Sequence, residues 1–502
     1  MGTGSSSSVP RRGAVGNSEE SSERPVKYYT RPRVAKIDKN AARRHYKSLK
    51  RKYLKKGIDL VLRGRRDPSP QSFDPATISI VIPPWHSPSG GGQGVAVQRS
   101  VGLSGGASLL SVKEQRRRTK QFLRESLGSL GWNGELRNSA TMSPFPPVAA
   151  AGGAGVAALP KASGTIRWLK ALDVFFLDNG SEAEKAALIK KGAVVLPNQV
   201  VRLNKPAARS LLPGVGPSDL WHLRQVNIGN AANRPTGKGE VVGVLDTGVE
   251  AKHSELEGRV VGFQKFSARG EKVAAEARDH DGHGTHVCAL IAGRKCGIAP
   301  GAQLAVASVL TEKSSGGAFG YFAQILAGYD WLVELRKKGS YNLGVINISA
   351  GTQEYSNYLL ASIQQARIAD GILTVVAVGN EASLSATSSP GNYPGVVSVG
   401  ATDQSDNVAT FSNSGNPAAH PAERKPDLAA PGVEVVSAWL GGKFRRMSGT
   451  SMASPIVAGA AALLREQEGG DPDAVDVRLR TLVAPGTASP RSGAGRLDLS
   501  SL

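Results

Sequence analysis

The sequence predicts an α/β protein in which a mainly parallel β-sheet lies between layers of helices. Two observations support this fold class. From about Leu220 onward, nearly continuous apolar runs alternate with helical stretches, a pattern typical of strands buried on both faces and joined by helical crossovers. Polar residues also follow several of these runs directly, at the strand ends where binding sites form in open α/β sheets.

The predicted elements follow one another along this region. Strands are expected within residues 239–248, 303–310, 343–349, 372–380 and 396–402. Helices are expected within residues 283–293, 322–337 and 450–467.

Charge divides the 502-residue chain unevenly. Residues 1–165 contain 28 Lys and Arg against 10 Asp and Glu, so they carry +18 of the net charge of +21 and leave +3 for residues 166–502. The strongly basic character therefore belongs to an N-terminal extension of low complexity. Three regions are predicted: a basic, partly helical and partly disordered extension at 1–165, a small α+β segment with a linker at 166–212, and the α/β region at 213–502.

The extension contains one densely basic stretch, residues 31–66. Apolar residues recur there at roughly helical spacing within 46–54, which predicts a basic amphipathic helix. Such a helix suits contact with nucleic acid or an anionic surface, and the alternative is a solvated helix or a disordered tail. Residues 67–165 contain a helical candidate, Val112 to Leu127, and have no assigned role.

Two cysteines, Cys288 and Cys296, are too few for a disulfide scaffold and are expected to be free thiols, with one local bridge as the alternative. No apolar stretch follows the N-terminal arginines, so no secretory signal peptide is evident. The sequence contains no run of about 18 apolar residues, so no membrane span is expected. A cytoplasmic location is therefore the default expectation, with export by another route left open.

Three motifs carry candidate chemistry. Asp246 follows a buried strand within Asp-Thr-Gly, a position that suits a carboxylate for orienting a histidine. His283 lies between two glycines at the start of a predicted helix. Ser451 lies in Gly-Thr-Ser-Met-Ala-Ser-Pro at the N-terminus of a small-residue helix, where its backbone N–H is free near the positive end of the helix dipole.

The order Asp, His, Ser, with DTG, GHGTH and GTSMASP, resembles the subtilisin-like serine proteases (subtilases, peptidase family S8) over about residues 213–500. The resemblance implies a three-layer subtilisin-like fold and a serine endopeptidase that hydrolyses peptide bonds through an acyl-enzyme. Ser451 would be the nucleophile, His283 the general base and then acid, and Asp246 the residue that orients His283. Asn380, in Val-Gly-Asn-Glu, matches the family's oxyanion-hole asparagine and would act with the Ser451 N–H.

The resemblance also implies how a protein or peptide substrate binds. Subtilases bind an extended peptide as an added strand between two enzyme segments. These segments are expected to be Gly316-Gly317-Ala318 and Ser349-Ala350-Gly351, whose small residues let a peptide backbone approach closely.

Further expectations concern activation and cofactors. Because subtilases carry an inhibitory propeptide directly before the catalytic domain, residues 166–212 are expected to be a propeptide with self-cleavage between Leu203 and Leu220. The alternative is an accessory lobe that is never removed. No cofactor is required and no metal ligands are assigned, since the loop that holds the family's tight calcium site is too short here, although calcium elsewhere is left open.

A second functional hypothesis is a bipartite protein. In it, the basic N-terminal region would bind nucleic acid or an anionic surface and so target the protease. The catalytic positions are intact, which argues against an inert protease domain.

Overall fold

The computed structural model describes residues 74–86, 112–132, 136–138, 164–203, 207–228, 234–315, 317–353, 355–417, 419 and 422–502. All of these residues belong to one unit, Phe73–Leu502. The basic stretch 31–66, predicted to contact nucleic acid or an anionic surface, lies outside the described residues.

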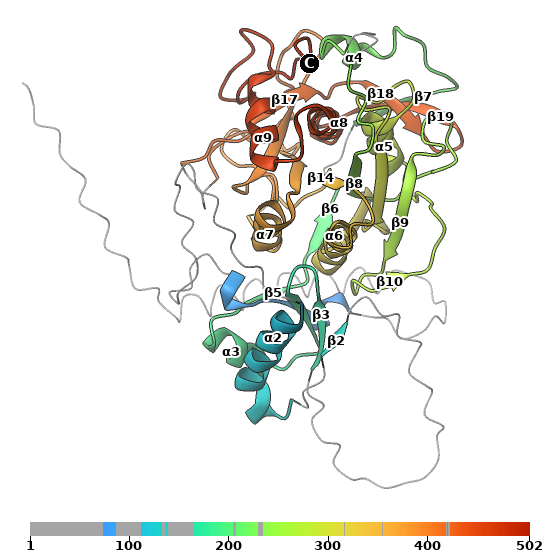
Figure 1. Ribbon diagram of the computed structural model, residues 1–502. Coiled ribbons are helices and arrows are strands. Elements are labelled where there is room, and N and C mark those ends of the chain that lie inside the picture. The colour runs from blue at the N-terminus through green and yellow to red at the C-terminus, as the bar shows by residue number, and fades with distance from the viewer. Residues whose placement is uncertain are drawn as a thin grey trace, which may run out of the picture. The chain divides into compact units, whose positions relative to one another are not determined.

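An eight-stranded sheet forms the centre of the larger region (Figure 1). Its order is β10 (Lys272–Val273), β9 (Val260–Phe266), β11 (Gln303–Ser308), β8 (Val241–Asp246), β14 (Leu343–Ile348), β15 (Leu373–Ala377), β16 (Val396–Thr402) and β17 (Leu428–Pro431). Every neighbouring pair is parallel except β10 with β9, which confirms the predicted mainly parallel sheet. All residues of β8 are buried, as expected for a strand covered on both faces.

Helices cover both faces of this sheet. Helices α5 (His283–Ala292), α8 (Thr450–Glu468) and α9 (Pro472–Thr481) share one apolar cluster with Val242 and Val244 of β8. Helices α6 (Phe322–Lys337) and α7 (Leu360–Asp370) share the other cluster with Val241 and Leu245. Because successive side chains of a strand point to opposite faces, the two clusters lie on opposite sides of β8 and give the three-layer arrangement.

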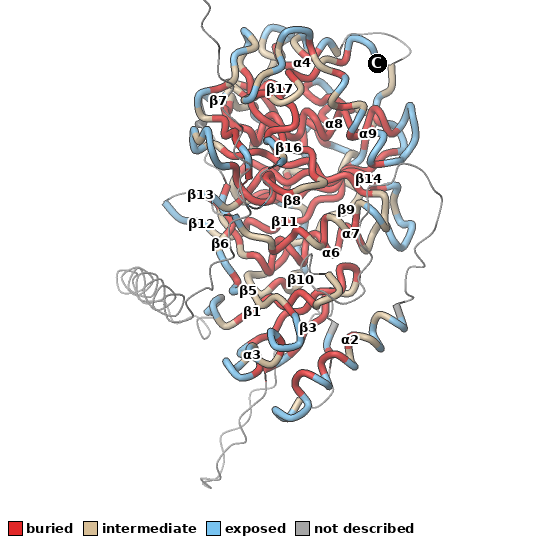
Figure 2. The backbone as a smooth tube through the Cα atoms, turned by 90° about the vertical axis from the view of Figure 1, so that its left-hand side faces the viewer, coloured by how far each residue is buried: buried red, intermediate tan, exposed pale blue. Residues whose placement is uncertain are grey.

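A smaller sheet precedes this region. Its order is β2 (Arg137–Asn138), β3 (Thr165–Leu169), β4 (Val174–Asp178), β1 (Ile78–Ile82) and β5 (Val194–Pro197). Helices α2 (Val112–Leu127) and α3 (Glu182–Lys190) share an apolar cluster with one face, through residues such as Leu123 and Leu188. The opposite face, with Ile80 and Phe176, belongs to the same cluster as α6. Figure 2 shows exposed residues along α2 and α3 and buried residues through the strands of the large sheet.

The boundary predicted at residue 165 does not coincide with a structural boundary. Strand β1 and helix α2 both lie N-terminal to it, and β1 pairs with β4 and β5 in the middle of the small sheet. The helix predicted at Val112–Leu127 is present as α2. The strand was missed because its pairing partners lie about a hundred residues further along the chain, so the sequence around β1 does not indicate the pairing.

Two short three-stranded sheets connect the regions. In one, β6 (Val200–Arg202) pairs antiparallel with β13 (Gly317–Tyr321), which pairs with β12 (Glu312–Ser314). In the other, β7 (Ala207–Leu212) pairs antiparallel with β19 (Lys443–Ser448), which pairs with β18 (Val435–Trp439). The stretch in which self-cleavage is expected, between Leu203 and Leu220, therefore contains a paired strand, β7.

Short helical elements complete the described chain. They are η1 (Pro75–Thr77), η2 (Pro84–His86), η3 (Gly128–Leu130) and α4 (Trp221–Gln225). Among the described helices, none combines the length and the apolar character needed to cross a membrane.

Candidate active site

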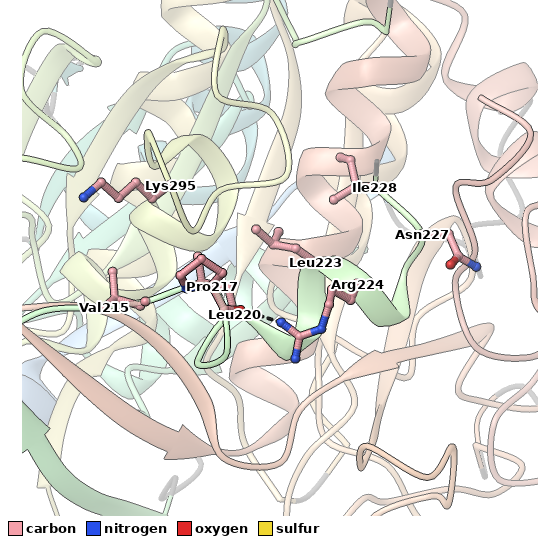
Figure 3. Close-up of a pocket in the computed structure, with 9 residues that line it drawn as sticks. Val215, Pro217, Leu220, Leu223, Arg224, Asn227, Ile228 and Lys295 are labelled. Atoms are coloured by element: carbon pink, nitrogen blue, oxygen red, sulfur yellow. Dashed lines mark hydrogen bonds between the residues drawn. The ribbon is translucent and has the colours of Figure 1, made fainter. Parts of the chain in front are cut away.

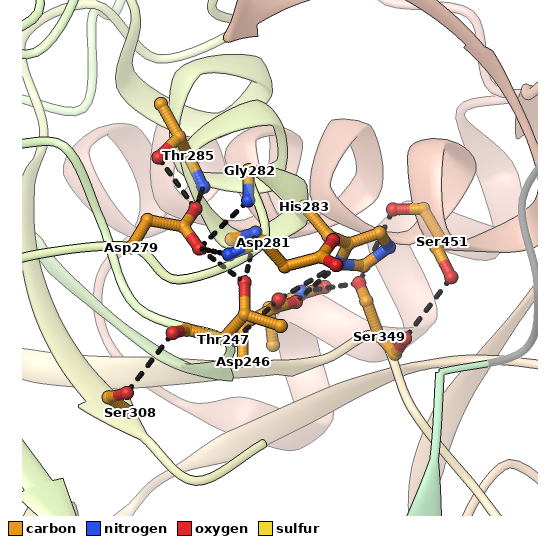
Figure 4. Close-up of polar contacts among 12 residues, drawn as sticks. Asp246, Thr247, Asp279, Asp281, Gly282, His283, Thr285, Ser308, Ser349 and Ser451 are labelled. Carbon is orange, nitrogen blue, oxygen red and sulfur yellow. Dashed lines mark hydrogen bonds and ion pairs between the residues drawn. The ribbon is translucent and has the colours of Figure 1, made fainter. Parts of the chain in front are cut away.

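Two of the predicted site residues meet at one edge of the large sheet. Asp246 is the last residue of β8, and His283 is the first residue of α5. The Nδ1 of His283 lies 2.8 Å from Oδ1 and 3.0 Å from Oδ2 of Asp246 (Figure 4). Both side chains are fully buried. The carboxylate therefore fixes the ring orientation and leaves Nε2 as the nitrogen available for proton transfer.

The pKa of His283 reflects two opposing effects. Burial alone lowers this pKa, because desolvation disfavours the charged ring. The charge of Asp246, its hydrogen bond and the charges of Asp281 and Asp279 act in the opposite direction and raise the pKa above its ordinary value. The site is therefore built to stabilise a protonated imidazole.

Ser451 is the second residue of α8. Its Oγ donates to the backbone carbonyl of Ser349 at 3.1 Å (Figure 4). The Nε2 of His283 is buried and has no hydrogen-bond partner among the described residues. Pro455 has no N–H to give the Ser451 carbonyl inside the helix, and the Ser349 Oγ approaches that carbonyl at 3.3 Å instead. Ser349 thus positions the serine from both sides.

Asn380 follows β15 and reaches the start of α8. Its Oδ1 accepts hydrogen bonds from Thr450 N at 2.9 Å and Thr450 Oγ1 at 2.8 Å. These bonds fix which end of the amide is its oxygen. The amide nitrogen is then the donor that can serve an anion beside the Ser451 N–H, which the helix itself leaves without an acceptor.

One residue that organises the site was missed at the sequence level. Asp279 accepts from the N–H of Gly282, from Thr285 N and Oγ1 at 2.8 and 2.7 Å, and from Thr247 Oγ1 at 2.8 Å (Figure 4). It therefore holds the loop before His283 against the turn after Asp246. Its place four residues before His283, in the Asp-His-Asp-Gly-His run, was the available signal.

The segments expected to bind substrate are occupied by the chain itself. Arg202 of β6 exchanges backbone hydrogen bonds with Gly351 at 3.2 and 3.1 Å. Leu203 N donates to the carbonyl of Ala318 at 3.3 Å. Strand β6 therefore lies between the two segments as an added strand, the arrangement that the resemblance implied for a substrate.

Strand β6 contacts the predicted triplets in part, through Ala318 and Gly351, and their role in binding substrate stays a prediction. The register of β6 on β13 runs over Phe319, Gly320 and Tyr321, further along the chain than the predicted triplet. Gly317 begins β13 without a β6 partner in that register, and Gly316 lies outside the described residues. On the other segment, Ser349 contacts Ser451, and Ala350 is buried between Ser349 and the paired Gly351.

The next described strand after β6 also pairs near Ser451. Strand β7 pairs with β19, with Ala207 opposite Ser448, three residues before Ser451. Strand β6 ends beside Gly351, two residues from the Ser349 carbonyl that holds Ser451. Strands β6 and β7 thus each pair with a segment close to the serine.

The remaining polar candidates do not suit catalysis. Cys288 and Cys296 are free and buried, as predicted, and burial raises the pKa of both thiols, which keeps them protonated. Burial lowers the pKa of His286 to about 3, so this ring is neutral. Within the described ranges, no group of three or more His, Cys, Asp or Glu could hold a metal ion. Calcium binding elsewhere stays a prediction.

A surface hollow of about 750 Å³ lies around α4, away from the site (Figure 3). Its lining contains none of the candidate catalytic or substrate-binding residues, so we assign the hollow no part in the chemistry. The lining residues are Val215, Gly216, Pro217, Leu220, Leu223, Arg224, Asn227, Ile228 and Lys295.

Comparisons with known proteins bear on this geometry. The sequence model of the subtilase family matches residues 237–484. Subtilisin-like protease 1 of Trichophyton equinum is 35% identical over 301 residues, 58% of this chain and 56% of that protein. Subtilisin-like protease 1 of Trichophyton verrucosum is 34% identical over 296 residues, 59% of this chain and 69% of that protein. A solved cold-adapted subtilisin-like serine proteinase is 31% identical with a TM-score of 0.46, covering 56% of this chain and 98% of that one.

A buried Asp–His pair and a helix-start serine on a mainly parallel sheet between helices define a class of α/β fold with a candidate Asp, His, Ser site. Within it, this chain belongs to the subtilase family. The chain spans little more than half the length of several curated relatives, including 56% of the Trichophyton equinum protein.

The comparisons correct the expected location. The relatives are secreted fungal subtilisin-like proteases, which points to an extracellular rather than a cytoplasmic location. The cytoplasmic expectation was wrong because it rested only on the composition of the N-terminal residues. The comparisons give no support to nucleic-acid binding by residues 31–66.

Proposed function

We propose that the chain is a serine endopeptidase that hydrolyses peptide bonds in protein substrates through an acyl-enzyme on Ser451. One observation carries the proposal: strand β6 of the chain itself lies between the two segments expected to bind substrate, and one of these segments holds Ser451 through the Ser349 carbonyl. Membership of the subtilase family supports the same reaction.

In the proposed reaction, the Ser451 Oγ leaves the Ser349 carbonyl and turns toward the Nε2 of His283, which accepts its proton as Oγ attacks the carbonyl carbon. The Asn380 amide and the Ser451 N–H donate to the oxyanion that forms. His283 then gives the proton to the leaving amine as the C–N bond breaks. A water molecule, deprotonated by His283, hydrolyses the ester and frees Ser451.

The same geometry supports self-processing. We infer that the bond cut lies between Leu203 and Ala207, a narrower interval than the predicted Leu203 to Leu220. The support is the pairing of β6 with β13 before this interval and of β7 with β19 after it. In this account, the region up to Leu203 is a propeptide that fills the cleft until it leaves.

The test compares purified full-length wild type with Ser451→Ala. Wild type is expected to cut its own chain within this interval, seen as new termini by mass spectrometry, and then to hydrolyse a peptide spanning residues 199–208. Ser451→Ala should do neither. Retained cleavage by Ser451→Ala would refute the role of Ser451, and an uncut but active wild type would refute the propeptide role.

A further inference from the structure

Arg202, the last residue of β6, has a different environment from the residues on either side of it. Val201 and Leu203 are buried, with 0% and 6% of their surfaces exposed. Arg202, between them, is exposed. Since side chains alternate along a strand, the cleft encloses the two apolar side chains and presents a separate surface to the third.

That surface is aromatic. Arg202 lies directly opposite Phe319 in the antiparallel register of β6 and β13. Its guanidinium carbon is 5.4 Å from the centre of the Phe319 ring, within the range of a cation–π contact. Tyr321 packs edge-on against Phe319 at 5.9 Å and extends the aromatic surface along the strand.

An acidic residue completes the row. Glu312 of β12 is directly opposite Phe319 on the other side of β13. Residues in register across antiparallel strands project from the same face of the sheet, so Arg202, Phe319 and Glu312 share one face. The pKa of Tyr321 reflects the same neighbours: burial raises it first, the charge of Glu312 raises it further, and the charge of Arg202 lowers it.

We propose that Phe319, Tyr321 and Glu312 form a subsite that selects a cationic side chain at the position of the bound substrate that Arg202 fills. This inference rests on the proposed endopeptidase function and specifies its substrates: two apolar residues flanking a basic one, with the basic residue two to five residues before the cut. The aromatic faces attract the cation through their quadrupoles, and Glu312 adds a screened Coulombic attraction.

The test uses peptides with the sequence of residues 199–208 and Arg, Lys, Gln or Glu at the position of Arg202. The full-length protein, after it has processed itself, should cleave the Arg peptide with a kcat/KM about 3- to 10-fold above that of the Gln peptide. A preference of this size is expected because the subsite is exposed to solvent. The Glu peptide should be poorest. The difference should appear mainly in KM and should shrink at high salt, because Glu312 is reachable by solvent ions.

Variants separate the aromatic and acidic contributions. Phe319→Leu keeps the apolar bulk but removes the ring, so the Arg-to-Gln ratio should fall toward one, whereas Phe319→Tyr should keep it. Glu312→Gln should lower the ratio for Lys most, because a compact ammonium depends on charge more than a guanidinium does. Glu257→Gln, which neutralises an exposed carboxylate outside the cleft segments, is the matched control and should leave the ratio unchanged.

A second readout needs no turnover. In full-length Ser451→Ala, hydrogen exchange reports the Arg202 and Leu203 amides, which donate to Gly351 and Ala318. Arg202→Gln should speed their exchange about 3- to 10-fold, because the cation–π contact and the attraction to Glu312 are lost. Arg202→Lys keeps the charge and should speed the exchange less. Equal kcat/KM for Arg and Gln peptides, with exchange unchanged by Arg202→Gln, would overturn the subsite. If wild type hydrolysed none of the peptides, the proposed function would fall and the exchange measurement alone would decide the subsite.

Discussion

In the proposed reaction, the proton of Ser451 passes to His283, whose ring is held by Asp246, and all three residues are buried. Asp246 contacts the Nδ1 of His283, so Nε2 is the ring nitrogen left to accept the proton. In the described state, Ser451 donates to the Ser349 carbonyl instead. This bond marks a resting position, because catalytic hydrogen bonds often form only when substrate is poised for reaction.

The oxyanion donor gives the first prediction. Asn380→Ala should lower kcat by about 10²–10³, the loss that the equivalent donor causes in subtilisin, a member of the same family. KM should change little, because the donor acts mainly on the developing charge. Steady-state kinetics on the peptide of residues 199–208 measures both. A kcat within threefold of wild type would exclude Asn380 from the oxyanion hole.

The second prediction concerns pH. Catalysis needs neutral His283, and Asp246 raises the pKa of this ring, so kcat/KM should fall as pH decreases through a value above 6.5. Asp246→Asn removes the charge that opposes burial, and the acid limb should move to lower pH while kcat drops by about 10⁴. The kcat/KM profile between pH 4 and 9 tests this. An acid limb that stays in place in Asp246→Asn would contradict the assigned coupling.

At the level of single residues, the sequence located the candidate side chains better than the strand pairing. Asp246, His283, Asn380 and Ser451 lie in motifs whose spacing is local, so each could be located. The pairing partners of β6 on β13 could not be located, because the register of the two strands is set by non-local hydrogen bonds. The register pairs β6 with Phe319 to Tyr321.

Helix α5 depends on a glycine at its start, which gives the third prediction. Gly282 has φ of 108°, and a Cβ there would lie 2.5 Å from the ring of Trp439. Gly282→Ala should therefore destabilise the fold by about 3 kcal/mol or more. Gly258→Ala is the matched control: φ is 76°, nothing lies within 4 Å of the added Cβ, and strain of about 1 kcal/mol is expected.

Unfolding of both variants in the Ser451→Ala background, where self-cleavage cannot interfere, gives the two free energies. Equal losses of unfolding free energy in the two variants would show that the contact with Trp439 does not restrict the side chain at position 282.

Elements were predicted where their patterns are local and missed where they are not. The apolar run of β8 and the periodicity of α2 identify these elements without their partners. Strand β1 was missed because its partner β4 lies about a hundred residues further along the chain. Strand β7 was taken for part of a linker because Pro and Gly residues follow it, and its pairing with β19 is not visible in the sequence.

For the molecule as a whole, the contact between the small sheet and α6 includes one buried acid. Asp330 accepts the backbone N–H groups of Ala171 at 2.7 Å and Leu172 at 3.0 Å. Burial raises its pKa to about 7, although these two bonds act in the opposite direction. Glu334 raises the pKa further and Lys272 lowers it.

This acid gives the fourth prediction. Once the cleaved N-terminal region leaves, Asp330 meets water and its pKa should return toward 3.8. A pKa raised in the bound state stabilises binding at low pH, and this contribution is lost as pH rises through about 7. The cleaved region should therefore dissociate more slowly at pH 5.5 than at pH 8.5, measured by size-exclusion chromatography over time. Asp330→Asn should remove most of the difference, and a pH dependence unchanged in that variant would assign it to other groups.

In the proposed function, Ser451 is the nucleophile of a site that the chain itself fills until it is cut. Labelling with a fluorophosphonate, followed by mass spectrometric mapping during self-processing, tests this role. We expect label on Ser451 alone, appearing only as the chain is cut between Leu203 and Ala207. Label on another residue, or no label on the fully processed protein, would contradict it.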